Sequence, residues 1–149
     1  MMSEANPGAA ARPPRWMPIG EEADLCAAGR WWDAIRAPET IGRRAIAFLV
    51  EAGQQLGPVI LDDGGPEPRM YFLASVGASE GWDEPATVAL GRSCHVVVPP
   101  AHRISPPGLH WHSLPTQPRV FARADSLRRA LAKARKEQQG PSFPPSPAP

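Results

Sequence analysis

A run of valines that ends at two prolines is the feature that most constrains this chain. Residues 96–98 are all valine, a β-branched residue that favours extended strands, and Pro99 and Pro100 follow directly. Proline has no backbone N–H and a fixed φ, so neither residue can continue a hydrogen-bonded ladder. We therefore predict a strand over residues 94–98 that ends at the prolines, and we place it centrally in the sheet.

Every histidine of the chain lies in the window 88–113 around this strand, together with two arginines. These six residues are Arg92, His95, His102, Arg103, His110 and His112. A second short strand is predicted at 110–112, after the turn-forming residues 106–108. We therefore expect a polar site of this protein to be built in the window 88–113.

Length and composition indicate one domain between two tails. The 149 residues include 20 prolines and 13 glycines, which indicates a loop-rich chain. We predict a folded domain over 20–137, a disordered tail over 1–19 and a disordered proline-rich tail over 138–149. A formal net charge of +1 argues against a protein that coats nucleic acid through bulk electrostatics, although it leaves room for a local basic patch.

Targeting signals and cysteine spacing give further expectations. Residues 1–18 contain no continuous apolar stretch of the secretory type, and no run approaches the ~20 apolar residues that a membrane span requires. We expect a soluble, cytoplasmic protein without a membrane partner. Cys26 and Cys94 lie far apart without metal-type spacing, so buried free thiols are favoured over a disulfide or a metal pair.

The hydrophobic pattern predicts alternating strands and helices in the first half of the chain. An acidic start and a terminal glycine predict a short helix over 21–29, and residues 30–36 read as a strand that ends before Pro38. Helical spacing of apolar residues predicts the longest helix over 39–56. Residues 58–61 and 70–74 are predicted strands. Strict alternation in the strand 30–36 sets Asp33 among apolar neighbours.

The second half adds a turn, an edge strand and a second helix. Residues 77–82 are predicted to form an irregular turn, and 119–122 an edge strand. A helix over 126–136 carries an apolar stripe, with Asp125 as its expected N-cap. Its many basic residues are typical of a solvated face or of a DNA contact. Together these elements predict an α+β fold, a small mixed β-sheet with helices packed on it.

Three blocks of the chain carry a family resemblance. They are residues 29–33 (Gly-Arg-Trp-Trp-Asp), residues 57–63 with the strand 70–73, and residues 95–103 leading to 108–111. In this order they resemble the N-terminal catalytic domain of bifunctional DNA primase/polymerases, a branch of the archaeo-eukaryotic primase superfamily. The chain is similar to short actinobacterial proteins given that label, over about residues 25–125. The resemblance implies a primase/polymerase-like fold and a role related to DNA replication.

The catalytic motifs of that family are mostly replaced here. The family holds two divalent metals with paired acidic residues at the first motif, where this chain has only Asp33, followed by Ile35. The family's triphosphate-binding histidine is replaced by Arg69 or Met70. Its third acidic residue falls where this chain has Arg92. The resemblance therefore implies that the scaffold is kept and that the metal chemistry is lost.

We consequently predict a non-catalytic binding or regulatory module without a cofactor. Its ligand would be a nucleotide, a nucleic acid or a protein. The residues expected to bind it are Arg69, Arg92, His95, His102, Arg103 and His110.

Two other functions stay open. An active nucleotidyltransferase would use Mg²⁺ or Mn²⁺ with Asp33, and a protein interaction module would bind through its tails and exposed aromatic residues. His110 and His112 share a strand face and have a spacing that is found in metal sites. The alternative is that they are ordinary, partly exposed polar residues that bind no metal. Aromatic side chains that could pack in the core or stack on bases are Trp31, Trp32, Tyr71, Phe72, Trp82 and Trp111.

Overall fold

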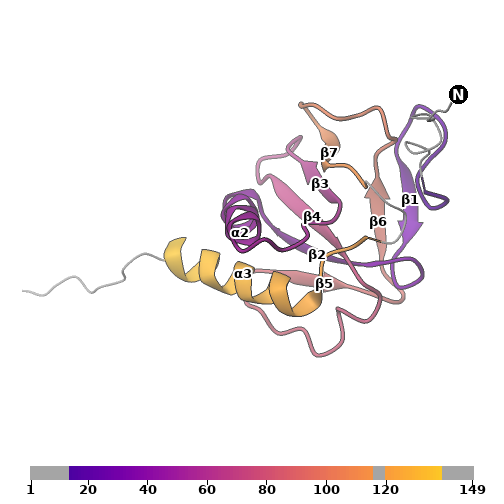
Figure 1. Cartoon of the computed structure of the whole chain (residues 1–149). Coiled ribbons are helices and arrows are strands. Elements are labelled where there is room, and N and C mark those ends of the chain that lie inside the picture. Colours follow the sequence, from indigo (N-terminus) through magenta and orange to yellow (C-terminus); the bar gives the residue numbers. More distant parts are fainter. Residues whose placement is uncertain (1–13, 116–119, 139–149) are drawn as a thin grey trace, which may run out of the picture.

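The computed structural model describes residues 14–115 and 120–138, which form three layers (Figure 1). Two helices cover one face of a five-stranded sheet, and a two-stranded sheet lies on the other side. The strands are β1 (Asp24–Ala27), β2 (Asp33–Pro38), β3 (Val59–Asp62), β4 (Arg69–Ala74), β5 (Val88–Leu90), β6 (His95–Val98) and β7 (Leu109–Ser113), and the helices are α2 (Glu39–Glu51) and α3 (Ala124–Gln138). The α+β fold predicted from the sequence is confirmed.

The larger sheet has the order β5-β2-β4-β3-β7, and each neighbouring pair in it is antiparallel. The sequence analysis predicted a mixed sheet with both parallel and antiparallel strands, and that part of the prediction is wrong. Phe72 lies at the centre of the sheet, paired with Ile35 on one side and Val59 on the other. These three side chains are fully buried, so the sheet is anchored around the middle of β4.

Strand alternation gives the five-stranded sheet two different cores. In β4, Met70, Phe72 and Ala74 face the helices, whereas Tyr71 and Leu73 face the two-stranded sheet. Successive side chains of a strand point to opposite faces, and here both faces are covered. Because both faces of β4 are buried, its sequence is almost continuously apolar rather than alternating.

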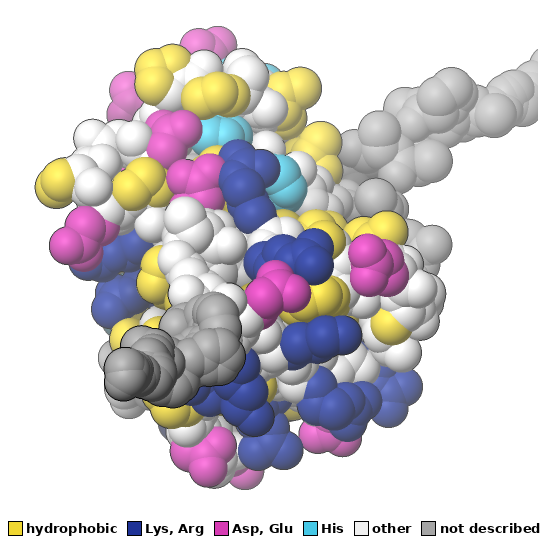
Figure 2. Space-filling view, turned by 90° about the vertical axis from the view of Figure 1, so that its left-hand side faces the viewer, with side chains coloured by type: hydrophobic (Ala, Val, Ile, Leu, Met, Phe, Trp, Pro, Cys, Tyr) yellow, Lys and Arg dark blue, Asp and Glu magenta, His cyan; other side chains and the backbone are white. Residues whose placement is uncertain are grey.

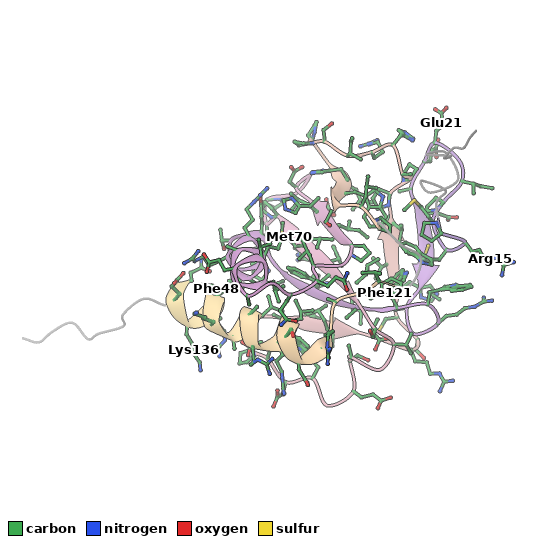
Figure 3. All side chains as sticks on the ribbon, viewed as in Figure 1. Arg15, Glu21, Phe48, Met70, Phe121 and Lys136 are labelled. Carbon is green, nitrogen blue, oxygen red and sulfur yellow. The ribbon has the colours of Figure 1, made fainter. Side chains whose placement is uncertain are left out.

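The helix layer is held by apolar stripes on α2 and α3. In α2, Ile41, Ala45 and Leu49 recur every four residues and pack into the helix-side core. Gly42 lets α2 approach the sheet, because a Cβ there would lie 2.7 Å from Met70 Sδ; Figure 3 shows Met70 between α2 and the sheet. Lysine and arginine side chains gather on the outward side of this layer (Figure 2).

The second core lies between the five-stranded sheet and the ribbon formed by β1 and β6. Its centre holds Trp32 and Trp111, which are 0% and 2% exposed. Trp16 and Met17 of the N-terminal segment are buried in the same core, although the sequence interpretation assigned them to the tail 1–19. The folded part therefore extends at least to residue 14, while residues 1–13 and 139–149 of the predicted tails lie outside the described residues.

Two predictions about the ribbon are wrong for the same reason. Residues 21–29 contain β1 rather than a helix, and β6 pairs with β1 in a separate sheet rather than lying centrally. Cys26 pairs with Val96 and Leu25 with Val97, so partners some seventy positions apart decide both conformations. Local charge and glycine signals carry no information about such a distant partner.

Smaller corrections concern where elements begin and end. The strand predicted at 30–36 starts at Asp33, and β5 was not predicted. The helix predicted at 39–56 ends at Glu51, since Gly53 has a φ of +71°. Asp125 lies in the first turn of α3 instead of capping it. Of the predicted edge strand 119–122, the structure describes a single bridge, between Ala74 and Ala122, and residue 119 lies outside the described residues.

Within the described part of the chain, no helix has the length and apolar character needed to cross a membrane. The longest is α3, with 15 residues, and it carries charged residues along its outer side.

Candidate ligand-binding site

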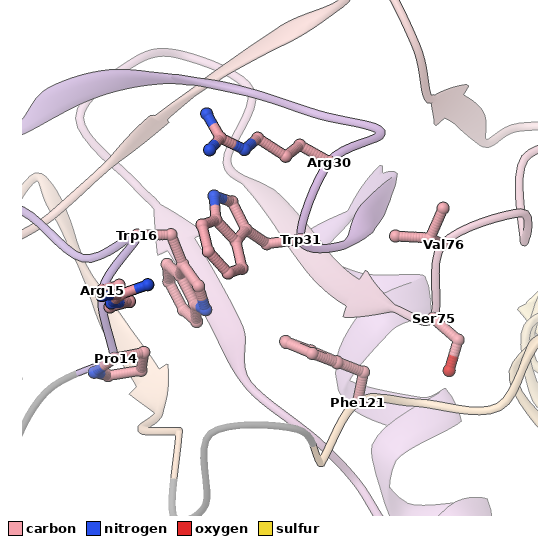
Figure 4. A pocket seen from close by; sticks show the side chains of 8 residues that line it. All are labelled: Pro14, Arg15, Trp16, Arg30, Trp31, Ser75, Val76 and Phe121. Atoms are coloured by element: carbon pink, nitrogen blue, oxygen red, sulfur yellow. The ribbon is translucent and has the colours of Figure 1, made fainter.

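A cavity of about 460 Å³ opens at the edge of the ribbon-side core (Figure 4). This volume lies in the range typical of small-molecule sites, about 300–1,000 Å³. We call it the aromatic pocket. It is lined by Pro14, Arg15, Trp16, Arg30, Trp31, Ser75, Val76 and Phe121. Four chain segments meet there: the N-terminal segment, the β1–β2 turn, the residues after β4, and the residues before α3.

The β1–β2 turn positions two of the lining residues. Gly29 has a φ of +89° and its N–H donates to the carbonyl oxygen of Trp32 at 2.8 Å, which closes the turn around Arg30 and Trp31. A Cβ at Gly29 would lie 2.7 Å from the Cα of Arg92. The turn therefore requires glycine, both for its left-handed backbone and for the close approach of the segment before β6.

The segment that carries Phe121 is held by backbone hydrogen bonds to the end of β4. Ala122 N–H donates to Leu73 O at 3.0 Å, and Ser75 N–H donates to Ala122 O at 3.1 Å. Ala122 itself is 1% exposed. These bonds fix the backbone on both sides of the pocket, so Phe121 and Ser75 are presented by a rigid frame.

The aromatic side chains form one fixed wall and one accessible ring. Trp16 is 8% exposed; its ring centroid lies 5.7 Å from that of Trp32 in an edge-to-face arrangement and 6.3 Å from that of Phe121. Trp31 is 37% exposed, and the guanidinium carbon of Arg30 lies 5.1 Å from its ring centroid. Figure 4 shows Arg30 beside Trp31 at the rim of the pocket. This wall is suited to a flat, apolar group.

The charged side chains of the pocket are both cations. Arg15 and Arg30 are exposed, and no aspartate or glutamate lines the cavity. The indole Nε1 of Trp16 is buried and has no hydrogen-bond partner among the described residues. The lining is therefore suited to a ligand that is aromatic in one part and anionic in another.

The six residues predicted to bind a ligand do not meet at one place. Arg92 and His95 lie before and at the start of β6, whereas His102 and Arg103 follow its other end. Arg69 is the first residue of β4, where it pairs with Asp62. Of these, Arg92 comes nearest to the aromatic pocket, because its backbone packs on the turn at Gly29.

His110 is a buried residue with a local partner. It is 3% exposed, and its Nδ1 lies 2.9 Å from the carbonyl oxygen of Gly108. Gly108 is in turn held by Asp63, whose Oδ1 accepts from its N–H at 2.6 Å. His110 therefore supports the loop before β7 and presents no ring face to the surrounding water.

Asp33, the one remaining acidic residue of the resembled catalytic motif, is 2% exposed. Its Oδ2 accepts hydrogen bonds from the backbone N–H groups of Gly77 at 3.0 Å and Ser79 at 2.9 Å. The carboxylate thus holds the loop that follows β4. Within residues 14–115 and 120–138, no group of three His, Cys, Asp or Glu side chains is placed to hold a metal ion.

Cys26 and His112 are two of the titratable groups whose pKa values are perturbed. Burial raises the pKa of the Cys26 thiol above its usual value, and the charge of Asp24 raises it further. The Sγ of Cys26 donates to the carbonyl oxygen of Trp16 at 3.4 Å, and Cys26 and Cys94 are both free thiols. Desolvation lowers the pKa of His112, with smaller lowering contributions from Arg43 and His110.

Sequence reasoning missed most of the aromatic pocket. Trp31 was weighed as a core residue or as a stacking platform, Trp16 was assigned to the N-terminal tail, and Arg15, Ser75, Val76 and Phe121 were not singled out. These residues lie in four separate segments, so no local spacing connects them. The tryptophan pair at 31–32 and the lone Trp16 in a polar segment were the available signals.

Comparisons of the chain with protein-family models, with curated proteins and with solved structures found no match.

Proposed function

We propose that this protein is a non-catalytic binding module that holds a nucleotide, or one nucleotide of a single strand, in the aromatic pocket. The observation that carries this proposal is the lining of one 460 Å³ cavity by two tryptophans, a phenylalanine and two arginines without any carboxylate. A nucleotide combines the same two requirements, a flat aromatic base and an anionic phosphate.

The chemistry of binding follows from the two kinds of side chain. The base stacks on Trp31, the accessible ring, and such stacking contributes about 1–3 kcal/mol per base. The phosphate is held by Arg15 and Arg30, whose planar guanidinium groups can donate two parallel hydrogen bonds to it. Arg92 packs its backbone on the turn that carries Arg30 and does not itself line the cavity.

The non-catalytic part of the proposal is supported by the position of Asp33. Its carboxylate is buried and already accepts two backbone N–H groups, which suits a structural residue. A relationship to the primase/polymerase fold, with the metal chemistry lost and nucleotide affinity kept, is part of this proposal. The module would then act in a process that uses nucleotides, such as DNA replication, as a regulator.

The proposal is tested by thermal unfolding with added ATP, dTTP and a dT10 oligonucleotide, each with and without Mg²⁺. A ligand that binds the folded protein raises its unfolding midpoint. We expect a shift that does not require metal. Trp31→Ala should weaken binding about 10- to 100-fold through lost stacking, and Trp31→Phe should restore part of it.

Arg69→Gln is the matched control for Arg30→Gln. Both variants remove one exposed arginine, but Arg69 begins β4 whereas Ser75 of the pocket follows its end, about 20 Å away at the rise of a strand. Arg30→Gln should weaken binding and Arg69→Gln should not. Equal affinity of the wild type and Trp31→Ala would refute the pocket assignment. Manganese-dependent extension of a primed template that is lost in Asp33→Asn would refute the non-catalytic assignment.

A further inference from the structure

The outer side of α3 carries three basic residues in a row, which we call the α3 basic stripe: Arg129, Lys133 and Lys136. Their spacing of four and three residues places them on one face of the helix, about 6 Å and 4.5 Å apart along its axis. All three are exposed. The side of α3 that packs on the sheet is formed by Leu127, Ala130, Leu131 and Ala134.

Three acidic residues around α3 are paired with cations outside the stripe. The ion pairs of this region are Arg44–Glu137, Arg128–Asp83 and Arg135–Glu84. Among the described residues, no ion pair includes a member of the α3 basic stripe. The charge of Lys133 acts on Glu137, which is already paired with Arg44, so the stripe is a row of positive charge without an ion pair of its own on a chain whose formal net charge is only +1.

Neighbouring aromatic packing holds one charge of the stripe in place. The Nζ of Lys133 lies 4.3 Å from the ring centroid of Phe48 on α2, and the guanidinium carbon of Arg44 lies 4.4 Å from the same centroid. A shallow groove of about 200 Å³ between the two helices includes Phe48, Arg129 and Lys133 in its lining. A cation held by a ring loses less side-chain freedom when it binds an anion.

The stripe lies away from the aromatic pocket. Figure 3 shows Phe48 and Lys136 on the helix side of the molecule and Arg15 on the opposite side. The space-filling view of the helix side shows lysine and arginine side chains gathered over its lower half (Figure 2). The two surfaces can therefore be tested separately.

We propose that the α3 basic stripe binds the phosphodiester backbone of a nucleic acid. Like charges four residues apart destabilise a helix, and a polyanion with regularly repeated charges removes that repulsion. An acidic protein fits this surface less well, because stable protein interfaces have an apolar and aromatic centre. Here the aromatic ring of Phe48 is already covered by Arg44 and Lys133.

The test measures fluorescence anisotropy of a labelled 20-nucleotide single strand and of the matching duplex, between 50 and 200 mM salt. Three phosphate contacts predict a slope of log K against log salt of about −2 for the single strand and about −3 for the duplex. Whichever of the two binds more tightly, the single strand or the duplex, is the form of nucleic acid that the stripe prefers. Changing all three stripe residues to Gln should bring the slope for the duplex close to zero and weaken duplex binding at least tenfold.

Lys133→Gln and Arg128→Gln form a matched pair of single variants. Each removes one exposed charge from α3, but only Lys133 belongs to the stripe, while Arg128 is paired with Asp83. We expect Lys133→Gln to weaken binding several-fold more than Arg128→Gln. Trp31→Ala removes a ring of the pocket proposed for single-strand nucleotides, so its control is the duplex, whose binding it should leave unchanged. Equal effects of the two charge variants, or no binding of either oligonucleotide at 50 mM salt, would overturn the proposal. Loss of duplex binding in Trp31→Ala would assign that binding to the aromatic pocket instead.

Discussion

The backbone nitrogen of Ala122 lies so close to Gly57 that there is no space for a Cβ atom at position 57. A Cβ built on Gly57 would be 2.6 Å from Ala122 N, and Gly57 has a φ of +74°. Ala122 N–H is the group that donates to Leu73 and fixes the segment next to Phe121. Gly57 therefore supports the aromatic pocket without lining it.

A comparison of two glycines tests this close approach. Gly53 has nearly the same φ, +71°, with nothing within 4 Å of its Cβ position. Gly53→Ala should reduce the free energy of unfolding by about 1 kcal/mol, the cost of a left-handed alanine. Gly57→Ala should reduce it by about 2–4 kcal/mol, because overpacking adds to the same backbone cost. Urea unfolding of both variants measures the difference, and equal losses would contradict the role of Ala122.

The two acceptor bonds of Asp33 predict a structural phenotype. Asp33→Ala leaves the N–H groups of Gly77 and Ser79 without an acceptor, so the free energy of unfolding should fall by about 2–4 kcal/mol. Asp33→Asn keeps a side-chain oxygen as acceptor, so its free energy of unfolding should fall by less than that of Asp33→Ala. Chemical unfolding with and without 5 mM Mg²⁺ or Mn²⁺ checks this. If the metal stabilises the wild type but not Asp33→Asn, the carboxylate is a metal ligand.

The hydrogen bond from Cys26 Sγ to Trp16 O predicts that thiol reactivity reports on the N-terminal segment. Burial raises the pKa of Cys26, so little of the reactive thiolate is present at neutral pH. Trp16→Ala removes a residue that is 8% exposed and should expose the thiol. The alkylation rate of Cys26, measured at pH 7.5 in a Cys94→Ser background, should therefore rise. An unchanged rate would show that the thiol is protected without Trp16.

The lowered pKa of His112 predicts a loss of stability in acid. Desolvation and the charge of Arg43 disfavour the protonated ring in the folded state, whereas the unfolded chain takes up the proton near pH 6.5. The contribution of His112 to the free energy of unfolding is therefore complete above about pH 6.5, and it is lost as the pH falls through the folded-state pKa.

The corresponding measurement compares urea unfolding at pH 7.5 and at pH 5.0. His110 and Glu39 also act on this ring, so the difference between wild type and His112→Gln is the informative quantity. The variant should lose less stability between the two pH values than the wild type. An equal loss in both proteins would assign the pH dependence to other groups.

Local signals in the sequence were sufficient for several elements. Helical spacing of apolar residues located α2 and α3, and the prolines after Val98 ended β6 at the expected residue. Alternation along the strand also placed Asp33 among apolar neighbours, although the contact of its carboxylate with the loop after β4 was not predicted. In each case the residues that decide the structure are close together in the chain.

Features that depend on distant partners were not predictable in the same way. The ribbon exists because β1 meets β6 across some seventy residues, and the aromatic pocket exists because Trp16, Trp31 and Phe121 meet in space. The six residues expected to form one site are distributed over separate strands and loops for the same reason. Spacing along a chain does not encode which loops converge.

The two cores on either side of β4 restrict how this strand can change in evolution. A substitution at Phe72 affects only the helix side, and one at Leu73 affects only the ribbon side, so effects on opposite sides should be nearly additive. A one-residue insertion within β4 would instead exchange the two sets of side chains. Point changes can therefore accumulate in this strand, whereas changes of length are confined to the loops around it.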